Sequence, residues 1–193
     1  MHVPVLYDQV MFWLQPRPGE RYIDGTVGGA GHARGILERS APDGRLLALD
    51  ADAEAIERAQ QVLAPFEDRV ELVHSNFSRL KDVVEQIGFA PVMGILLDLG
   101  ISSWQLASKE RGFSFQLDGP LDMRFDTNQE LTADVAVNQM PVDELADLLW
   151  RYGEERQARQ IARAIVAHRP IRGTAELAQV IRSAVKYHDK INP

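Results

Sequence analysis

Cysteine is absent from the 193 residues, which excludes disulfide bonds and metal sites built on thiolates. The sequence also has no run of about 18 consecutive apolar residues, and its N-terminus lacks the basic segment of a secretion signal. No cluster of histidines and carboxylates has the spacing of metal ligands, so no metal is expected. The sequence therefore favours a cytoplasmic protein without a membrane partner.

Two common phosphate-binding patterns are missing as well. The P-loop pattern, Gly-x-x-x-x-Gly-Lys followed by Ser or Thr, occurs nowhere. The glycines after Ile23 do not have the Gly-x-Gly-x-x-Gly spacing that binds the pyrophosphate of a dinucleotide. P-loop enzymes are thus excluded, and a nicotinamide-dependent reductase becomes a weak alternative.

Positive charge is scarce in most of the chain but not at its end. The formal net charge is −7. Residues 1–150 contain 12 basic and 24 acidic side chains, whereas residues 151–193 contain 9 basic and 4 acidic ones. A polyanion would dock on this basic end. An ordinary solvated helical surface explains the same charge equally well.

A glycine-rich segment follows a short buried strand near the N-terminus. Tyr22 and Ile23 end this strand, Asp24 follows it, and four glycines occur between residues 25 and 31. The pattern is typical of the nucleotide-binding turn of a βα unit, where a ligand approaches the backbone. The next apolar run ends in Asp50, at the position where a carboxylate binds ribose hydroxyls. We therefore expect a ligand that contains a nucleoside.

Apolar runs alternate with helical patterns along the first hundred residues. Strands are expected to end at Asp24, Asp50, His74 and Asp98, the last of them spanning residues 92–98. This alternation predicts a parallel α/β sheet whose ligand contacts lie at the carboxyl ends of the strands. Each polar residue there is explained equally well as a strand terminator or a helix cap, but their recurrence at every strand end favours a binding crevice.

The amino-acid composition of the sequence changes after Asp98. Residues 100–125 are rich in Gly, Ser, Asp and aromatic residues without periodicity, which is typical of long functional loops. Helices are expected again from Val142, over residues 158–166 and over about residues 175–187. Three arginines, Arg156, Arg159 and Arg163, fall on a flank of the apolar face of the second of these helices.

Several longer motifs extend over nearly the whole chain. They are Asp24-Gly-Thr-x-Gly-x-Ala-Gly-His32, Leu96-Leu-Asp-Leu-Gly-Ile-Ser-Ser103, Glu110-Arg-Gly-Phe-Ser-Phe115, Asp118-Gly-Pro-Leu-Asp-Met-Arg124 and Tyr152-Gly-Glu-Glu-Arg156. In these motifs the sequence closely resembles the MraW/RsmH family, whose members methylate N4 of a cytidine in the decoding region of 16S ribosomal RNA. The resemblance implies a class I methyltransferase with a Rossmann-like parallel sheet, S-adenosylmethionine as cofactor and the small ribosomal subunit as partner.

The resemblance also implies two domains. Residues 1–103 would form a Rossmann-like domain that binds S-adenosylmethionine, and residues 104–193 a helical insert that recognises RNA. Members of the family continue beyond the Asn-Pro found here at residues 192–193, through strands that complete the sheet. Those C-terminal strands are absent from this sequence. A catalytically incomplete fragment that acts only as an RNA- or ribosome-binding module is therefore the alternative to an active methyltransferase.

Carried over position by position, the resemblance implies a set of residues around the cofactor: Gly28, Ala30, Gly31, His32, Asp50, Phe77, Asp98 and Gln105. Asp50 would hold the ribose, Phe77 would pack against the adenine, and the backbone of residues 28–32 would line the methionine end. Many members have glycine where this chain has Ala30.

One carboxylate is a candidate for catalysis. We hypothesise that Asp98 accepts a hydrogen bond from the exocyclic amine of cytosine and aims its nitrogen at the methyl donor. A contact with the cofactor alone is an equally weighted alternative.

Aromatic and basic residues of the loops are candidates for contact with RNA. Because the target cytosine must be unpaired, Trp104, Phe113 and Phe115 are candidates for base stacking, with core packing as the alternative, which is favoured for Phe115. Arg111 and Arg124 are candidates for phosphate binding. Salt bridges to Asp118 or Asp122 that anchor the loop explain these two arginines equally well.

Overall fold

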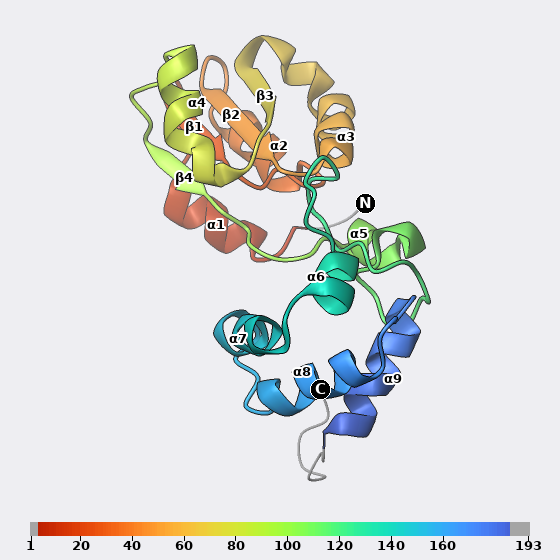
Figure 1. Ribbon diagram of the computed structural model, residues 1–193. Helices are drawn as coiled ribbons and strands as arrows, with labels where there is room; N and C mark the ends of the chain where they lie inside the picture. The colour runs from red at the N-terminus through yellow and green to blue at the C-terminus, as the bar shows by residue number, and fades with distance from the viewer. Residues whose placement is uncertain (1–3, 186–193) are drawn as a thin grey trace. The chain divides into compact units, whose positions relative to one another are not determined.

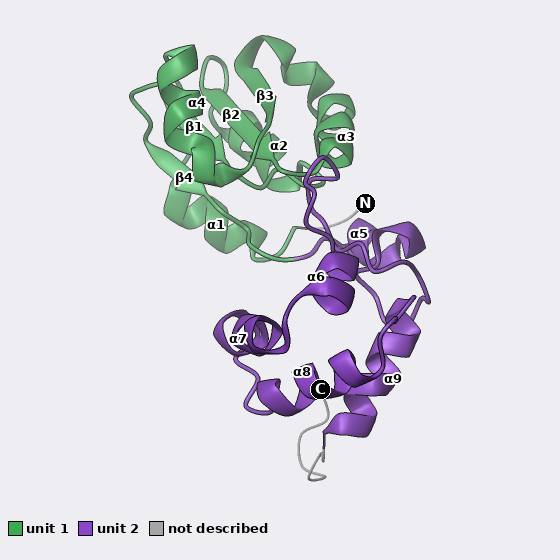
Figure 2. Ribbon diagram, viewed as in Figure 1, with its two compact units in different colours: residues 1–100 green, residues 101–193 purple. Residues whose placement is uncertain are grey.

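The computed structural model describes residues 4–185 and divides the chain into two compact units. Unit 1 comprises residues 1–100 and unit 2 comprises residues 101–193 (Figure 2). Each unit has its own apolar core.

Unit 1 is built on a four-stranded parallel sheet (Figure 1). Its strands are β1 (Arg21–Asp24), β2 (Arg45–Asp50), β3 (Val70–His74) and β4 (Gly94–Leu96), in the spatial order β3-β2-β1-β4. Every neighbouring pair is parallel, which confirms the predicted α/β class. The strand order reverses beside β1, and ligands of such sheets bind at the carboxyl ends of the strands at this point.

Strand β4 is shorter than the predicted span of residues 92–98. After Leu96 the chain leaves the strand, and the backbone N–H of Asp98 donates to the side-chain hydroxyl of Thr26 at 2.7 Å. A side chain thus replaces the backbone partner that a longer strand would have used. β4 is also the edge strand of the described sheet, and Ile95 on it is 52% exposed.

Helices pack on both faces of the sheet because side chains alternate along each strand. On one face, Tyr22 and Leu46 pack against α1 (Tyr7–Leu14), α2 (Gly31–Arg39) and α3 (Ala53–Leu63). On the other face, Ile23 and Leu47 pack against α4 (Leu80–Ile87). Two short 3-10 turns, η1 (Ala64–Arg69) and η2 (Phe77–Arg79), flank β3. Burial of each large apolar side chain stabilises this layered core by about 1.5–3 kcal/mol.

Unit 2 is helical in the part that the structure describes. Its helices are α5 (Ser103–Ala107), α6 (Ala133–Gln139), α7 (Val142–Gly153), α8 (Ala158–Ala167) and α9 (Thr174–Ala184), with a 3-10 turn η3 (Lys109–Arg111). Leu145, Ile161 and Val180 bring α7, α8 and α9 into one core. The last predicted helix ends earlier than expected, at Ala184, and residues 186 and 187 lie outside the described residues.

Among residues 4–185, we find no helix that is both long enough and apolar enough to cross a bilayer.

Candidate functional site

The loop between β1 and α2 is held by backbone hydrogen bonds to both neighbouring strands. The N–H of Gly25 donates to the carbonyl of Leu96 next to it on β4, at 2.9 Å. The N–H of Val27 donates to the carbonyl of Leu49 on β2, also at 2.9 Å. The glycine-rich loop therefore lies at the carboxyl ends of β1, β2 and β4, as the sequence predicts for a ligand-binding turn.

Two glycines of this loop are required for different reasons. Gly28 has a φ of 49°, which favours glycine, and a Cβ added there would meet nothing closer than the carbonyl oxygen of Thr26 at 3.8 Å. The space beside Gly28 is thus open for a ligand. A Cβ added to Gly31 would lie 2.3 Å from Cγ of Pro4, so this glycine permits close packing of the N-terminal segment. Between them, the buried Ala30 has a φ of 59° and precedes α2.

Asp50 closes the loop from the end of β2. One carboxylate oxygen accepts a hydrogen bond from the N–H of Gly28 and the other accepts one from the N–H of Asp52, each at 2.9 Å. Burial raises the pKa of Asp50 above its usual range, while these two hydrogen bonds act in the opposite direction. Each oxygen keeps a second lone pair for a hydroxyl donor. This geometry suits the ribose-binding role that the sequence suggests.

Asp24 lies at the end of β1 and is only 1% exposed. Its carboxylate accepts a hydrogen bond from the N–H of Thr26 at 3.1 Å. Burial, helped by the negative charges of Asp50 and Asp98, raises the pKa of Asp24 to about 7. Three carboxylates thus gather at the switch point of the sheet, and their combined potential attracts a cation.

Asp98 follows β4 and faces His32. The Asp98 side chain is half exposed, and its Oδ2 lies 3.9 Å from Nδ1 of His32, beyond hydrogen-bonding distance. The Nε2 of His32 lies 3.0 Å from the carbonyl oxygen of Val5, which accepts a hydrogen bond when Nε2 carries a hydrogen. In the tautomer protonated at Nε2 alone, Nδ1 presents a lone pair to the carboxylate. A ligand amino group placed between these two acceptors would donate to both.

Phe77 begins η2 at the carboxyl end of β3. Its Cβ lies 3.3 Å from the position of a Cβ added to Gly25, so the phenylalanine is next to the glycine-rich loop. Its side chain is 38% exposed, and the carboxamide of Asn76 fixes the turn by accepting from the N–H of Ser78 at 2.9 Å. Asn76 thus acts as a cap, and Phe77 is available for stacking on a flat ligand.

Gln105 belongs to unit 2, where it is 7% exposed. Its side-chain oxygen accepts from the N–H of Ser102 at 3.0 Å, and its own N–H donates to the Ser102 hydroxyl at 3.2 Å. This capping box starts α5 and gives Gln105 a local structural function. Its contact with a cofactor stays a prediction.

The two arginines predicted from the sequence to bind phosphate donate hydrogen bonds to backbone carbonyls of unit 2. The guanidinium of the buried Arg111 donates to the carbonyls of Arg124 and Phe125 at 2.9 and 3.0 Å. Arg124 forms an ion pair with Asp122 at 2.7 Å and donates to the carbonyls of Thr127 and Gln129. The Asp122 salt bridge weighed from the sequence is therefore present, and contact of these arginines with phosphate stays a prediction.

The aromatic candidates differ in exposure. Phe113 packs against Phe125 with ring centroids 5.2 Å apart. Trp104 is 43% exposed and Phe115 is 65% exposed, so the second does not fill a core.

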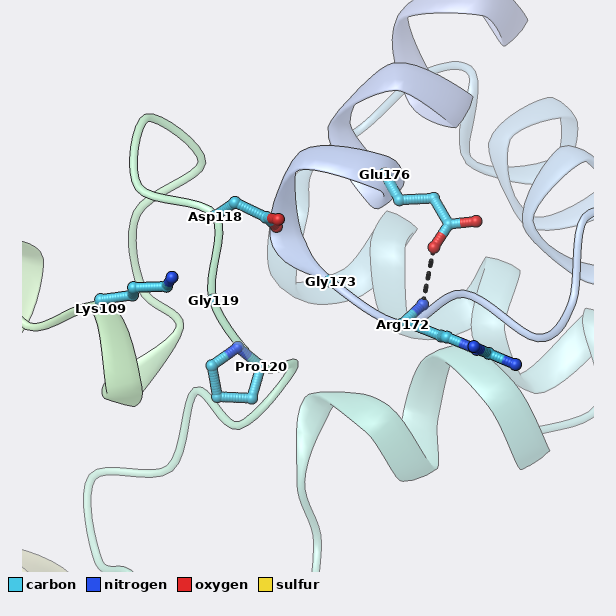
Figure 3. A pocket seen from close by; sticks show the side chains of 7 residues that line it. All are labelled: Lys109, Asp118, Gly119, Pro120, Arg172, Gly173 and Glu176. Carbon is cyan, nitrogen blue, oxygen red and sulfur yellow. Dashed lines mark hydrogen bonds between the residues drawn. The ribbon is translucent and has the colours of Figure 1, made fainter.

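Unit 2 also contains a pocket of about 350 Å³, shown in Figure 3. Glu176 accepts from the N–H of Arg172 at 2.8 Å, and Asp118 accepts from the N–H of Ala175 at 3.2 Å. Both carboxylates thus accept hydrogen bonds from backbone N–H groups near the start of α9. In Figure 3 the guanidinium of Arg172 extends away from Lys109, so the pocket does not bring its two cations together around an anion.

Comparison with known proteins identifies the family. A model of the MraW methylase family matches residues 1–193. The chain belongs to the MraW methylase family. Methylases of this family use S-adenosylmethionine.

The curated relatives in the MraW family carry one name. The chain is 49% identical over 193 residues to a ribosomal RNA small subunit methyltransferase H from Dehalococcoides mccartyi, covering all of this chain and 55% of that protein. It is 51% identical over 187 residues to the protein of the same name from Syntrophotalea carbinolica, covering 95% of this chain and 60% of that protein. The chain thus spans little more than half the length of these relatives.

Among solved structures, an S-adenosylmethionine-dependent O-methyltransferase from Thermotoga maritima matches with a TM-score of 0.37 and 20% identity. The match covers 41% of this chain and 31% of that one.

The residues of unit 1 fit the cofactor of the MraW family. S-adenosylmethionine carries a sulfonium and an ammonium cation, which three carboxylates at one sheet edge attract. Its ribose needs an acceptor such as Asp50, and its adenine needs a flat apolar surface such as Phe77. Sequence reasoning missed Thr26, whose hydroxyl fixes the backbone of Asp98. The Asp-x-Thr spacing after a strand was the available signal, because such residues form local turns.

Proposed function

We propose that this chain binds S-adenosylmethionine in unit 1 and methylates N4 of a cytidine in the decoding region of 16S ribosomal RNA. The reaction class is that of an rRNA (cytosine-N4-)-methyltransferase acting on the small ribosomal subunit in the cytoplasm. The family and the names of the relatives support methyl transfer to small-subunit ribosomal RNA, and the choice of N4 of a cytidine is part of the proposal. The observation that carries the proposal is the hydrogen bond from Gly28 to Asp50, which joins the glycine-rich loop to the ribose-binding carboxylate at 2.9 Å.

The role of Asp98 follows from its position opposite His32. The amino nitrogen of cytosine is a poor nucleophile because its lone pair is delocalised into the ring. A hydrogen bond from that amine to the Asp98 carboxylate favours the rehybridised nitrogen and fixes its direction. Positioning of the two reactants as a whole contributes up to about 7–11 kcal/mol in favourable cases, and this hydrogen bond supplies part of it. The cofactor supplies the methyl group. Thr26 positions the carboxylate through its bond to the Asp98 backbone at 2.7 Å.

The ammonium group of the cofactor is the other amine that fits between Asp98 and His32. The two assignments differ in kinetics. If Asp98 positions cytosine, Asp98→Asn lowers kcat at saturating cofactor. If Asp98 binds only the cofactor, the variant raises the KM for S-adenosylmethionine and leaves kcat unchanged.

A second candidate function is RNA binding without methyl transfer. The basic charge of residues 151–193, with nine basic and four acidic side chains, supports it.

The test is a calorimetric titration of the chain with S-adenosylmethionine. Asp50→Ala is expected to abolish binding, whereas Glu57→Ala, which removes an exposed acid of α3 outside the site, is expected to leave it unchanged. Transfer of a labelled methyl group to small ribosomal subunits then separates the two functions. Cofactor binding without transfer would favour the RNA-binding candidate, and no binding at millimolar cofactor would contradict the proposed site.

A further inference from the structure

Six arginines of unit 2 divide into two sets by their partners. Arg111, Arg124 and Arg169 donate to backbone carbonyls of the unit, and Arg169 does so at 2.6 Å to Val137 and Met140. The second set comprises Arg156, Arg159 and Arg163, all exposed. Within residues 4–185, these three guanidinium groups have no ion pair, hydrogen bond or aromatic partner. Arg172 and Arg182, next to and on α9, are exposed as well, but the second set forms a group on and next to α8.

The fold holds these three arginines close together. The buried face of α8 consists of Ala158, Ile161, Ala162 and Ile165. Arg159 and Arg163 are one turn apart on the opposite side, and neighbours at this spacing lie side by side on a helix. Arg156 lies in the turn that joins α7 to α8, whose start is fixed by the bond from the Gln157 N–H to the Glu155 carboxylate at 2.7 Å.

This arrangement of charge is unfavourable for the isolated helix. The first turn of α8 contains no acid, and Arg159 places a positive charge where the helix dipole is already positive. Arg159 and Arg163 also repel each other at the i, i+4 spacing. α7 follows the opposite rule, with Asp143 and Glu144 in its first turn and Arg151 in its last. The arginines of α8 therefore do not serve the stability of their own helix.

An exposed aromatic side chain lies close to them in the chain. Tyr152 ends α7 four residues before Arg156 and is 85% exposed. Guanidinium groups bind phosphate in a bidentate manner, and exposed aromatic rings stack on unpaired bases. Binding of an acidic protein would explain the exposed arginines but not the exposed tyrosine.

We propose that Arg156, Arg159, Arg163 and Tyr152, called here the arginine surface, bind an unpaired segment of ribosomal RNA. The proposal rests on the proposed function, because it concerns the RNA that carries the target cytidine. Stacking on Tyr152 requires unpaired bases, which the target cytidine must also be. The arginine surface thereby supplies the electrostatic attraction that unit 1, with its excess of acids, lacks.

The test measures binding of the chain to a fluorescent single-stranded 20-nucleotide RNA over a range of salt concentrations. The variant R156Q/R159Q/R163Q is expected to weaken binding at least about tenfold at low salt and to reduce the salt slope by about 2. The control R34Q/R79Q/K81Q removes the same charge from exposed, ion-paired residues of unit 1 and is expected to change neither quantity. Melting temperatures establish that each variant is folded.

A second pair of variants tests the stacking. Tyr152→Ala is expected to weaken binding by roughly 5- to 150-fold without changing the salt slope. Trp13→Ala removes a comparably exposed aromatic residue, 81% accessible on α1, and is expected to have no effect. Equal losses in both variants would overturn the role of Tyr152.

Two results would overturn the arginine surface while leaving methyl transfer intact. One is unchanged RNA affinity in R156Q/R159Q/R163Q. The other is weaker binding to small ribosomal subunits with unchanged binding to free RNA, which would indicate a protein partner. Conversely, loss of RNA binding in the variant of a chain that transfers no methyl group would support the surface and contradict the proposed function.

Discussion

The two units place their charged groups in opposite ways. In unit 1 the functional charges are carboxylates at strand ends, and backbone N–H groups hold those of Asp24 and Asp50 in position. In unit 2 the buried guanidinium of Arg111 donates hydrogen bonds to backbone carbonyls. The guanidinium groups of the α8 arginines form no hydrogen bond or ion pair within the described residues. A preorganised acidic crevice suits a small cationic ligand, whereas an exposed basic helix face suits a long polyanion.

The largest effect is expected for Asp24, the most buried carboxylate of unit 1. Its pKa is about 7 in the folded chain and near 3.8 when unfolded, so between these values the folded state binds the additional proton. Stability therefore falls as pH rises through this window, by about 1.4 kcal/mol per pH unit, and levels off above pH 7. Asp24→Asn, which still accepts from Thr26, is expected to remove this dependence.

The free energy of unfolding of the variant and of the parent is measured by urea unfolding between pH 3 and pH 8. Hydrogen exchange of the β1 amides then locates the difference in the sheet. The variant and the parent are expected to agree at pH 3 and to separate progressively up to pH 7. Parallel curves would show that folding does not change the pKa of Asp24.

The corresponding change in unit 2 concerns Arg111. Arg111→Met keeps the volume but leaves the carbonyls of Arg124 and Phe125 without their donor, which is expected to destabilise unit 2 by about 2–4 kcal/mol. Hydrogen exchange of residues 122–127 measures this loss, with the exposed Arg182→Met on α9 as control. Unchanged cofactor binding is expected. Weaker RNA binding with unchanged stability would instead assign Arg111 to the substrate.

A smaller effect is expected for Thr26, whose hydroxyl fixes the backbone of Asp98, the carboxylate proposed to position cytosine. Thr26→Val removes the acceptor of the Asp98 N–H and is expected to lower kcat about 5- to 10-fold, equivalent to about 1 kcal/mol, with an unchanged KM for cofactor. Thr26→Ser keeps the hydroxyl and is expected to restore the rate. Equal rates in both variants would mean that the backbone of Asp98 is fixed by the strand alone.

The contrast between the units also explains what the sequence could predict. Parallel strands place the residues that follow them at one edge, so Asp24, Asp50 and Asp98 were found from apolar runs alone. The roles of Arg111 and Arg124 depend on which loop carbonyls lie within reach, and no periodicity encodes that. β4 ended early for a similar reason, because a side chain 72 residues away competes for its backbone.

Ala30 gives the smallest expected effect and tests whether the crevice tolerates local strain. Its φ of 59° brings the alanine Cβ into a conformation that costs roughly 1–2 kcal/mol, and Ala30→Gly relieves this cost. The glycine also makes the unfolded chain more flexible and removes a buried methyl group. These two effects lower the stability by an amount similar to the strain that is relieved. We therefore expect a net change within about 1 kcal/mol in urea unfolding. A destabilisation well beyond that would mean that the methyl group, packed in the core beside α2, matters more to the loop than its backbone strain does.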